Sequence, residues 1–471
     1  MLRICKFRKV VIHREYKNSR GIMMIKIFKR KIYNEILKWK KDGGTTALLI
    51  KGARRIGKST IVKEFVEKEY KSYIMIDFSY VGPEINNLFL DISNKDRFFA
   101  NLQLLTGVQL FNRESVIVFD EVQCNPLARQ AIKHLVHDGR YDYIETGSLL
   151  SIQKNVKDIL IPSEESSIVM HPLDFEEFCW AIGEDMIPAT IRSILFEKNQ
   201  FGESQHRYLM KIFREYMLIG GMPQAISKYL EDKNYFSVEK VKRNIIELYQ
   251  NDFRKIDRSG MYSKLFSGIP GQLNANLGRY EASSVSKYAR PSKMHGAIVE
   301  MADSKVIDVS YAITDPNIGL GFSLDMSRFK LFTADTGIFT TLAFINDEIN
   351  NNEFYKQFIK DKVPANLGYL FENAVSQIIV STNKEPYFYT YQDKESKHSY
   401  EIDFILSKNG KIIPIEVKSS QKSTCHKSLD KFMQKFSDRI DIAYVIHTKD
   451  INQFEKICYV PIYAFPFILE R

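Results

Sequence analysis

The hydrophobic and polar positions in the first third of the chain follow two different periods. Short continuous apolar runs, typical of strands buried on both faces, are separated by segments whose apolar residues recur every three or four positions, as in amphipathic helices. This alternation predicts an α/β fold over about residues 25–183, in which helices cover both faces of a parallel sheet. The expected helices are 31–41 and 59–70, and the expected strands are 47–50, 73–78, 116–119, 143–145 and 168–171.

The middle of the chain, residues 184–345, has mostly helix-period segments and is predicted to be mainly helical. A tight break interrupts it at Gly220-Gly221-Met222-Pro223, because glycine pairs and proline end helices. Short helices followed by a strand over residues 262–309 suit a winged-helix module, with residues 282–288 in its second helix. A plain helical lid explains the same weak pattern, and the sequence favours that simpler interpretation.

The last region, residues 346–471, begins with an acidic, Asn-rich connector and then predicts a second α/β domain. Asn409-Gly410 supplies the positive φ angles of a tight hairpin turn between two strands. The expected helix is 367–380, and the expected strands are 386–391, 401–407, 412–417 and 441–446.

Composition narrows the class of protein. The 471 residues suit about three domains, and 44% hydrophobic residues are enough for packed cores. The net charge of +10 makes DNA a candidate partner, although a solvated lysine-rich surface gives the same balance. The five cysteines form no C-x-x-C pair, so we expect a cytoplasmic protein without a zinc module or a disulfide framework.

The N-terminal segment, residues 1–24, is basic and lacks the apolar stretch of a signal peptide. We expect a dispensable leader, because Met23 and Met24 directly precede the first clear helix and either can be the true start. A nucleic-acid-binding arm is the alternative. No apolar run reaches the roughly 20 residues that span a bilayer, so no membrane partner is expected.

A phosphate-binding motif follows the first predicted strand. Glycines at both its fixed positions let the backbone turn its N–H groups around phosphates, and the start of the next helix adds partial positive charge. Lys58 is expected to reach the β- and γ-phosphates of ATP, and the Ser59 hydroxyl to ligate Mg²⁺. The alternative is a chance match of the motif in a glycine-containing turn. The predicted strand before the motif and the predicted helix after it disfavour that alternative. The ATP-binding residues are Gly52-Ala53-Arg54-Arg55-Ile56-Gly57-Lys58-Ser59, which fit G-x-x-x-x-G-K-[ST], and the following Thr60.

A second strand, Val116–Phe119, ends in two acids, Asp120 and Glu121, as in a Walker B segment. Burial of the strand places Asp120 at the C-terminal edge of the sheet, where ligands bind in open α/β sheets. Asp120 is expected to hold the Mg²⁺ that accompanies ATP, and Glu121 to orient and activate the attacking water. These roles predict an ASCE (additional-strand, catalytic-glutamate) NTPase domain. A solvated strand end is the alternative, which the upstream P-loop disfavours.

The strand 143–145 leads into two small polar residues that can act as a sensor of the γ-phosphate or the water. Thr146 is the sensor candidate named for the site, and Ser148 is equally placed. A simple exit from strand to turn explains the same residues. No arginine can be assigned as a finger, because Arg54 and Arg55 lie in the loop and Arg140 precedes the strand.

The C-terminal region carries a second constellation: Glu372, Asp403, Glu416 and Lys418. Residues two apart in a strand share a face, so Glu416 and Lys418 point the same way and the hairpin brings Asp403 beside them. The pattern is similar to the core of PD-(D/E)XK nucleases, in which Asp403 and Glu416 would bind Mg²⁺ and Lys418 would position water. A structural ion-pair cluster is the alternative, and the two interpretations stay open.

The order of these motifs resembles a prokaryotic AAA-type ATPase family from about Ile25 to the end. Besides the P-loop, the resemblance rests on Pro172-Leu173-Asp174-Phe175-Glu176-Glu177-Phe178, on the Gly-Gly-Met-Pro break and on Ile415-Glu416-Val417-Lys418. It implies an AAA ATPase domain, a winged-helix-like middle segment and a C-terminal restriction-endonuclease-like domain of unknown function. Members often carry a Gly-Arg pair before the Pro-Leu segment; residues 160–166 hold no arginine here, which implies slow hydrolysis.

The sequence therefore predicts an Mg²⁺-dependent ATPase that acts as a switch or motor, with DNA as a candidate partner. A homo-oligomer is also expected as a candidate, because many AAA-type enzymes complete their sites with a neighbouring subunit. Two alternatives remain: an ATP-gated, metal-dependent DNA nuclease, and a regulator that senses the nucleotide without hydrolysing it.

Overall fold

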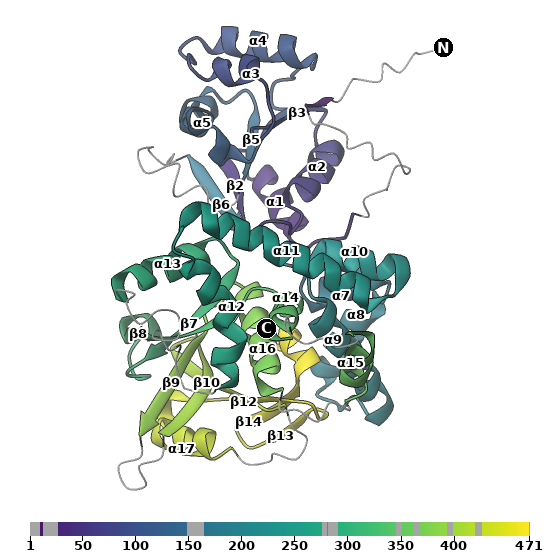
Figure 1. The fold of residues 1–471 in the computed structure, drawn as a ribbon, viewed down its shortest axis with the longest axis vertical. Helices are drawn as coiled ribbons and strands as arrows, with labels where there is room; N and C mark the ends of the chain where they lie inside the picture. The colour runs from purple at the N-terminus through teal and green to yellow at the C-terminus, as the bar shows by residue number, and fades with distance from the viewer. Residues whose placement is uncertain are drawn as a thin grey trace. The chain divides into compact units, whose positions relative to one another are not determined.

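The computed structural model describes residues 10–12, 27–147, 164–275, 280, 291–344, 351–361, 367–392, 399–419 and 426–470. The chain forms two compact units, Met1–His171 and Pro172–Arg471, here named unit 1 and unit 2 (Figure 1). Within the described ranges, none of the helices combines the length and the apolar character that crossing a bilayer requires.

Unit 1 is built on a parallel sheet in the order β1-β3-β4-β5-β2-β6. The five predicted strands are confirmed, and their ends differ from the expected ones by at most three residues. The additional strand β1 was not predicted and lies within the basic segment 1–24. The strands are β1 (Val10–Ile12), β2 (Ala47–Lys51), β3 (Ser72–Asp77), β4 (Ser115–Asp120), β5 (Asp142–Thr146) and β6 (Glu165–Val169).

The strand order places β5 between β2, which leads into the P-loop, and β4, which ends in Asp120. An additional strand between these two is what the ASCE class requires, so the order confirms the P-loop NTPase fold. The helices of unit 1 are α1 (Ile32–Lys41), α2 (Lys58–Glu69), α3 (Pro83–Leu88), α4 (Lys95–Thr106) and α5 (Pro126–Asp138), with a short 3₁₀ turn, η1 (Val122–Cys124).

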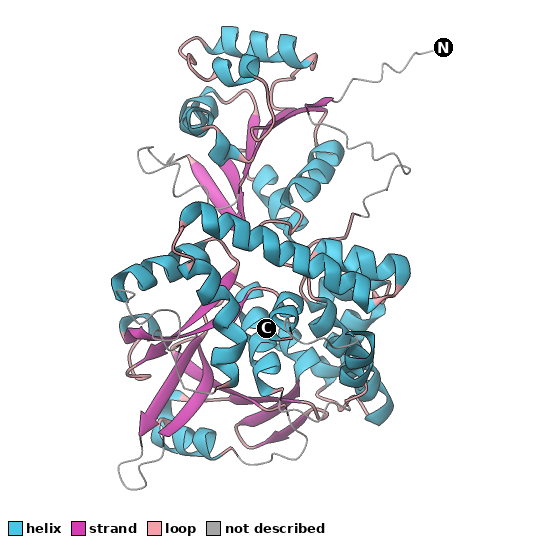
Figure 2. Ribbon diagram, in the orientation of Figure 1, coloured by secondary structure: helices cyan, strands magenta, loops and turns pink. Residues whose placement is uncertain are grey.

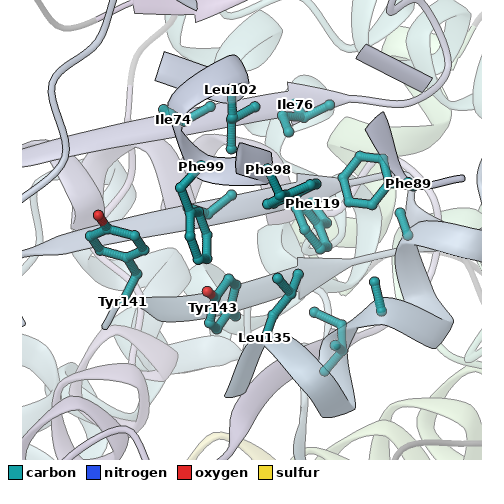
Figure 3. Close-up of a cluster of buried hydrophobic side chains, with 14 of the residues drawn as sticks. Ile74, Ile76, Phe89, Phe98, Phe99, Leu102, Phe119, Leu135, Tyr141 and Tyr143 are labelled. Carbon is teal, nitrogen blue, oxygen red and sulfur yellow. The ribbon is translucent and has the colours of Figure 1, made fainter. Parts of the chain in front are cut away.

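One face of this sheet packs against a layer of aromatic side chains, shown in Figure 3. Phe119 of β4 meets Phe89 edge to face with ring centroids 5.5 Å apart, and Phe89 meets Phe98 of α4 at 5.4 Å. Each such pair contributes roughly 0.5–1.5 kcal/mol to stability, beyond the contribution of its buried area. Because Phe119 directly precedes Asp120, this packing fixes the end of β4 that carries the acid.

On the other side, α2 buries Ile61, Val62 and Phe65 and contacts β3 and β5. Tyr33 of α1 packs on Phe65 with ring centroids 5.2 Å apart. The two faces are therefore both covered, which explains the continuous apolar runs in the centres of β2, β3 and β4.

Unit 2 contains a mixed sheet in the order β13-β14-β12-β11-β10-β9-β7-β8, drawn in magenta in Figure 2. The predicted turn is confirmed, because Asn409 and Gly410 have φ angles of 51° and 76° and join β10 to β11 as an antiparallel hairpin. The strands are β7 (Ile307–Ile313), β8 (Leu324–Thr333), β9 (Tyr387–Gln392), β10 (Ser399–Lys408), β11 (Lys411–Val417), β12 (Ala443–His447), β13 (Asn452–Phe454) and β14 (Ile457–Pro461).

The middle of the chain, residues 184–345, is mainly helical as predicted, but it also contributes two strands to this sheet. β7 pairs in parallel with β9, and β8, which was not predicted, pairs with β7. The residues 282–288 predicted for the winged helix lie outside the described residues. The helices of unit 2 are α7 (Phe175–Ile182), α8 (Met186–Glu197), α9 (Glu203–Ile219), α10 (Pro223–Asp232), α11 (Tyr235–Ile256), α12 (Met261–Asn274), α13 (Pro291–Asp303), α14 (Thr336–Ala343), α15 (Asn351–Ile359), α16 (Gly368–Ser381), α17 (Lys427–Lys435) and α18 (Phe465–Leu469).

The two segments that gave the sequence its specific resemblance touch each other in unit 2. Leu173 donates its backbone N–H to the carbonyl oxygen of Gly221 at 2.8 Å, and Gly221 donates its own N–H to Asp335 Oδ2 at 2.6 Å. A Cβ atom at Gly221 would overlap the backbone of Leu173. The glycine is therefore needed for this close approach of two chain segments.

Candidate functional site

The P-loop between β2 and α2 bends through three residues with positive φ. These are Gly52 at 155°, Arg55 at 71° and Gly57 at 95°. A Cβ atom at Gly52 would lie 2.5 Å from Ile56 Cδ1 and would overlap the carbonyl oxygen of Met170. The glycines expected from the motif are thus required by the loop itself, whereas Arg55 is an exposed side chain on a left-handed backbone.

Arg30 supports this loop from the segment before α1. Its Nη1 donates to the carbonyl oxygen of Ile56 at 3.1 Å, and its Nη2 donates to that of His171 at 2.5 Å. The side chain is buried, so the guanidinium fastens the loop rather than facing solvent. Sequence reasoning missed Arg30, because an isolated arginine before a helix belongs to no motif.

Lys58 lies buried at the first position of α2. Its Nζ donates to the carbonyl oxygens of Gly52 and Ala53, both at 2.9 Å. Burial lowers the pKa of Lys58 to about 8, although Glu121 and Asp120 favour the charged form. The loop therefore wraps its own carbonyls around an ammonium group that would gain from an anionic partner.

Asp120 is the point where the predicted metal-binding residues meet. Ser59 Oγ donates to Asp120 Oδ1 at 2.9 Å, and the Thr146 hydroxyl donates to the same oxygen. Burial raises the pKa of Asp120, the two hydroxyl donors oppose that shift, and Glu121 and Asp77 add to it. Three residues from α2, β4 and β5, namely Ser59, Asp120 and Thr146, thus converge at the C-terminal edge of the sheet.

The side chains and the backbone of this site are of the chemical types that bind ATP and Mg²⁺. A serine hydroxyl and a carboxylate are the hard oxygen ligands that Mg²⁺ prefers. They lie beside a lysine and a loop whose glycines permit backbone N–H groups to face a phosphate chain. The residues that would hold the nucleotide and the ion are therefore present and mutually placed.

Glu121 has an unusual backbone and a direct partner. Its φ angle is 52°, in the left-handed region where non-glycine residues are uncommon. Gln123 Nε2 donates to Glu121 Oε2, and the Gln123 side chain is buried. A buried amide thus fixes the carboxylate expected to activate water. This contact could not be predicted, because a glutamine two residues after an acid belongs to no motif.

Two of the arginines considered as candidates for an arginine finger, a residue that stabilises the transition state, lie in different parts of unit 1. Arg140 donates to Asp138 at 2.6 Å and to Asp96 at 2.7 Å, and it lies before the N-terminal end of β5, away from the edge with Asp120. Arg54 is half-buried within the loop. Ser148, the second sensor candidate, lies outside the described residues.

The C-terminal constellation is brought together, but with two residues that the sequence analysis did not include. Oxygen atoms of Glu372, Glu401 and Asp403 lie within 4.8 Å of one another. Lys330 of β8 donates to Glu372 Oε1 at 2.8 Å and to Glu401 Oε1 at 2.5 Å. Glu401 could have been found from its spacing, because it lies two residues before Asp403 on the same strand.

The other predicted members of that constellation are also paired internally. Asp403 Oδ2 accepts a hydrogen bond from the backbone N–H of Val417 at 2.7 Å. Lys418 Nζ donates to Glu416 Oε1 at 2.6 Å, so these two side chains do share a face. Burial, followed by the charges of Glu416 and Glu372, raises the pKa of Asp403 well above its usual range.

Three family models match successive parts of the chain. Residues 44–179 match an AAA domain. Residues 210–349 and 367–465 match two domains of unknown function, DUF8612 and DUF4143 respectively. A search of curated proteins gives no match.

Solved structures with a detectable likeness are distant. They include PCH-2 from C. elegans, with 12% identity and a TM-score of 0.26 over 46% of this chain and 70% of that one. The RuvB Holliday junction branch migration motor of Thermotoga maritima has 11% identity and a TM-score of 0.26, over 59% and 89%. Cdc6p from Pyrobaculum aerophilum has 11% identity and a TM-score of 0.24, over 73% and 97%. These values are too low to indicate function.

The AAA-domain match and the strand order agree with each other. The matched residues contain the P-loop, the strand ending in Asp120 and the strand ending in Thr146. The part of the chain that matches an AAA domain, residues 44–179, therefore has the core of a P-loop NTPase fold. The chain as a whole is α/β with a second, mixed sheet in unit 2.

Proposed function

We propose that unit 1 hydrolyses ATP in the presence of Mg²⁺. The observation that carries the proposal is the shared acceptor at Asp120, whose Oδ1 accepts from Ser59 of α2 and Thr146 of β5. These three side chains, with Lys58 and Glu121 beside them, supply a place for a cation, a phosphate chain and an attacking water. The match of residues 44–179 to an AAA domain supports the same proposed function.

Each residue has a distinct part in the proposed reaction. Lys58 neutralises charge on the β- and γ-phosphates, and the backbone from Gly52 to Thr60 holds them. Ser59 and Asp120 hold Mg²⁺, which when bound neutralises charge developing on the phosphates. Glu121 orients water and takes up its proton. Thr146 senses the presence of the γ-phosphate through its link to Asp120.

The test is phosphate release from ATP by the full chain, with and without Mg²⁺. Wild type is expected to turn over only with the metal ion, and Lys58→Ala is expected to lose both ATP binding and turnover. Turnover that persists in Lys58→Ala would contradict the proposal. Adding duplex DNA to the same assay tests the proposed partner, for which the net charge of +10 is the support.

We infer that hydrolysis drives a switch or motor, in which the nucleotide state of unit 1 changes what unit 2 can bind. A homo-oligomer fits this role, and sedimentation with and without ATP checks it. Stimulation of turnover by DNA supports a nucleic-acid motor. ATP binding without turnover supports the alternative of a nucleotide-sensing regulator.

The nuclease hypothesis concerns unit 2 and has a separate discriminator. It requires DNA cleavage with Mg²⁺ or Mn²⁺ that disappears in Asp403→Ala. The closeness of Glu372, Glu401 and Asp403 favours it. However, Lys330 already bonds two of these carboxylates, so we do not extend the proposal to DNA cleavage.

A further inference from the structure

Lys330 is the least expected charged residue in unit 2. It lies on β8, in the middle of the sequence, and its side chain is 5% exposed. A lysine is almost never buried in this way without a charged partner. The partners are carboxylates from two other elements, Glu372 on α16 and Glu401 on β10.

The surroundings of the ammonium group are those of a bound cation. Nζ lies 2.8 Å from Glu372 Oε1 and 2.5 Å from Glu401 Oε1. It also lies 5.5 Å from the centre of the Phe388 ring, within the range of a cation–π contact. Asp403 adds a further favourable charge. An ion that bridged the same two oxygens would compete with Nζ for them.

A β-bulge explains how the acids reach this point. Ile402 pairs with Tyr389 and Ile405 pairs with Tyr387, so Asp403 and Phe404 of β10 oppose one residue, Phe388 of β9. Bulges redirect side chains and are frequent beside functional sites. Here the bulge lies beside the ring that contacts Lys330.

We propose that Lys330 is the resident cation of the Glu372–Glu401–Asp403 cluster and that it excludes a divalent metal ion from it. The ion pairs of Lys330 then connect β8 with α16 and β10. Its ammonium group takes the place of a metal ion among the three carboxylates. Two other candidate ligand atoms are also bonded within the protein, because Glu416 Oε1 accepts from Lys418 and Asp403 Oδ2 accepts from the backbone of Val417. Glu416 Oε2, in contrast, is buried without a hydrogen-bond partner.

Displacing Lys330 would be costly. The ammonium group would have to leave both carboxylates while remaining in a buried position, and an uncompensated buried charge is strongly unfavourable. The carboxylates are arranged for N–H donors at hydrogen-bond distances, which are longer than the roughly 2.0–2.1 Å of Mg²⁺–oxygen contacts. The cluster as it stands therefore fits a lysine better than magnesium.

The first experiment measures Mn²⁺ binding to the full chain without nucleotide, by calorimetry or electron paramagnetic resonance. Wild type and Glu401→Gln are compared, since both keep the P-loop residues unchanged. The proposal expects the same number of bound ions in both. An ion that wild type binds and Glu401→Gln loses would overturn it. Because no ATP is present, the result is independent of whether unit 1 is an ATPase.

The second experiment removes the lysine charge with Lys330→Met, which keeps the length and apolar stem of the side chain. The expected result is one additional Mn²⁺ bound per chain relative to wild type, and a melting temperature that rises with Mn²⁺ by more than that of wild type. Lys330→Met/Glu401→Gln, with one carboxylate fewer, is expected to lose the additional ion. Lys264→Met, at an exposed position of α12, is the control.

A folded Lys330→Met protein that binds no additional ion would contradict the proposal, because the vacated position would then not be a cation site. If Lys330→Met does not fold without metal, the proposal expects Mn²⁺ to restore folding. Failure of Mn²⁺ to do so counts against it. The comparison of wild type with Glu401→Gln decides the exclusion claim in either case.

Discussion

The charge of Lys58 links nucleotide binding to pH. Because burial lowers its pKa to about 8, the free protein loses this positive charge as the pH rises through that value. Bound phosphates favour the charged form, so binding above about pH 8 must take up a proton. The affinity for ATP is therefore expected to fall by roughly tenfold per pH unit above that point, measured by equilibrium titration.

Lys58→Arg is the matched control for this effect. Arginine stays charged across the whole range, so its affinity for ATP, although weaker overall, is expected to be independent of pH there. The same slope in Lys58→Arg and wild type would show that another group causes the dependence.

Gln123 is expected to act as a positioning residue for Glu121. Gln123→Leu removes the donor to Glu121 Oε2 while keeping a buried side chain of similar size. The turnover number is expected to fall by roughly tenfold to a hundredfold, with the affinity for ATP unchanged, because the hydrogen bond that is removed orients the carboxylate of Glu121. Gln123→Asn, which keeps the amide on a shorter side chain, should be intermediate. An unchanged turnover number in the leucine variant would exclude this role.

At the scale of elements, the contact between the segment before α7 and the segment before α10 depends on Gly221. Gly221→Ala places a methyl group against the backbone of Leu173, and backbone cannot move aside as a side chain can. The variant is expected to lose up to about 3 kcal/mol of unfolding free energy, as overpacking does, measured by denaturant titration. Gly296→Ala in α13 is the control. A Cβ there meets no atom within 4 Å, so a gain of up to about 1 kcal/mol is expected.

The elements also show what the sequence could and could not predict. β2 and β4 are largely apolar runs, and β5 has only the apolar pair Tyr143-Ile144 between Asp142 and Glu145. Each of the three strands leads into residues of the candidate nucleotide site. The motif and the parallel strands on either side of it therefore followed from local pattern. β8 begins with polar and exposed residues, and its partners are distant in sequence. Neither the strand nor the position of Lys330 could be predicted, because both depend on tertiary pairing.

The boundary of the C-terminal domain was likewise beyond local pattern. β7 and β8 belong by sequence to the helical middle, yet they form one end of the sheet of unit 2. Only the pairing of β7 with β9 reveals this, and a single sequence carries no record of that pairing.

At the scale of the whole molecule, a buried charge cluster in unit 1 links stability to pH. Burial raises the pKa of Glu145 to about 8, although Arg129 opposes the shift. A carboxyl whose pKa is higher in the folded than in the unfolded state stabilises the fold when protonated, and this contribution is lost as the pH rises through about 8. The melting temperature is expected to fall between about pH 5 and pH 9. Glu145→Gln should weaken that dependence, and an equal fall in both proteins would contradict the assignment.

In the proposed mechanism, hydrolysis of ATP by this chain depends on Glu121. Single-turnover hydrolysis of ATP, with protein in excess and binding measured on the same samples, tests it most directly. Glu121→Gln is expected to bind ATP as wild type does and to hydrolyse it roughly 10²–10⁴-fold more slowly, the usual contribution of a general base. Equal rates in the two proteins would exclude Glu121 as the catalytic base. A wild type that binds ATP and never cleaves it would exclude an ATPase and favour a nucleotide-sensing regulator.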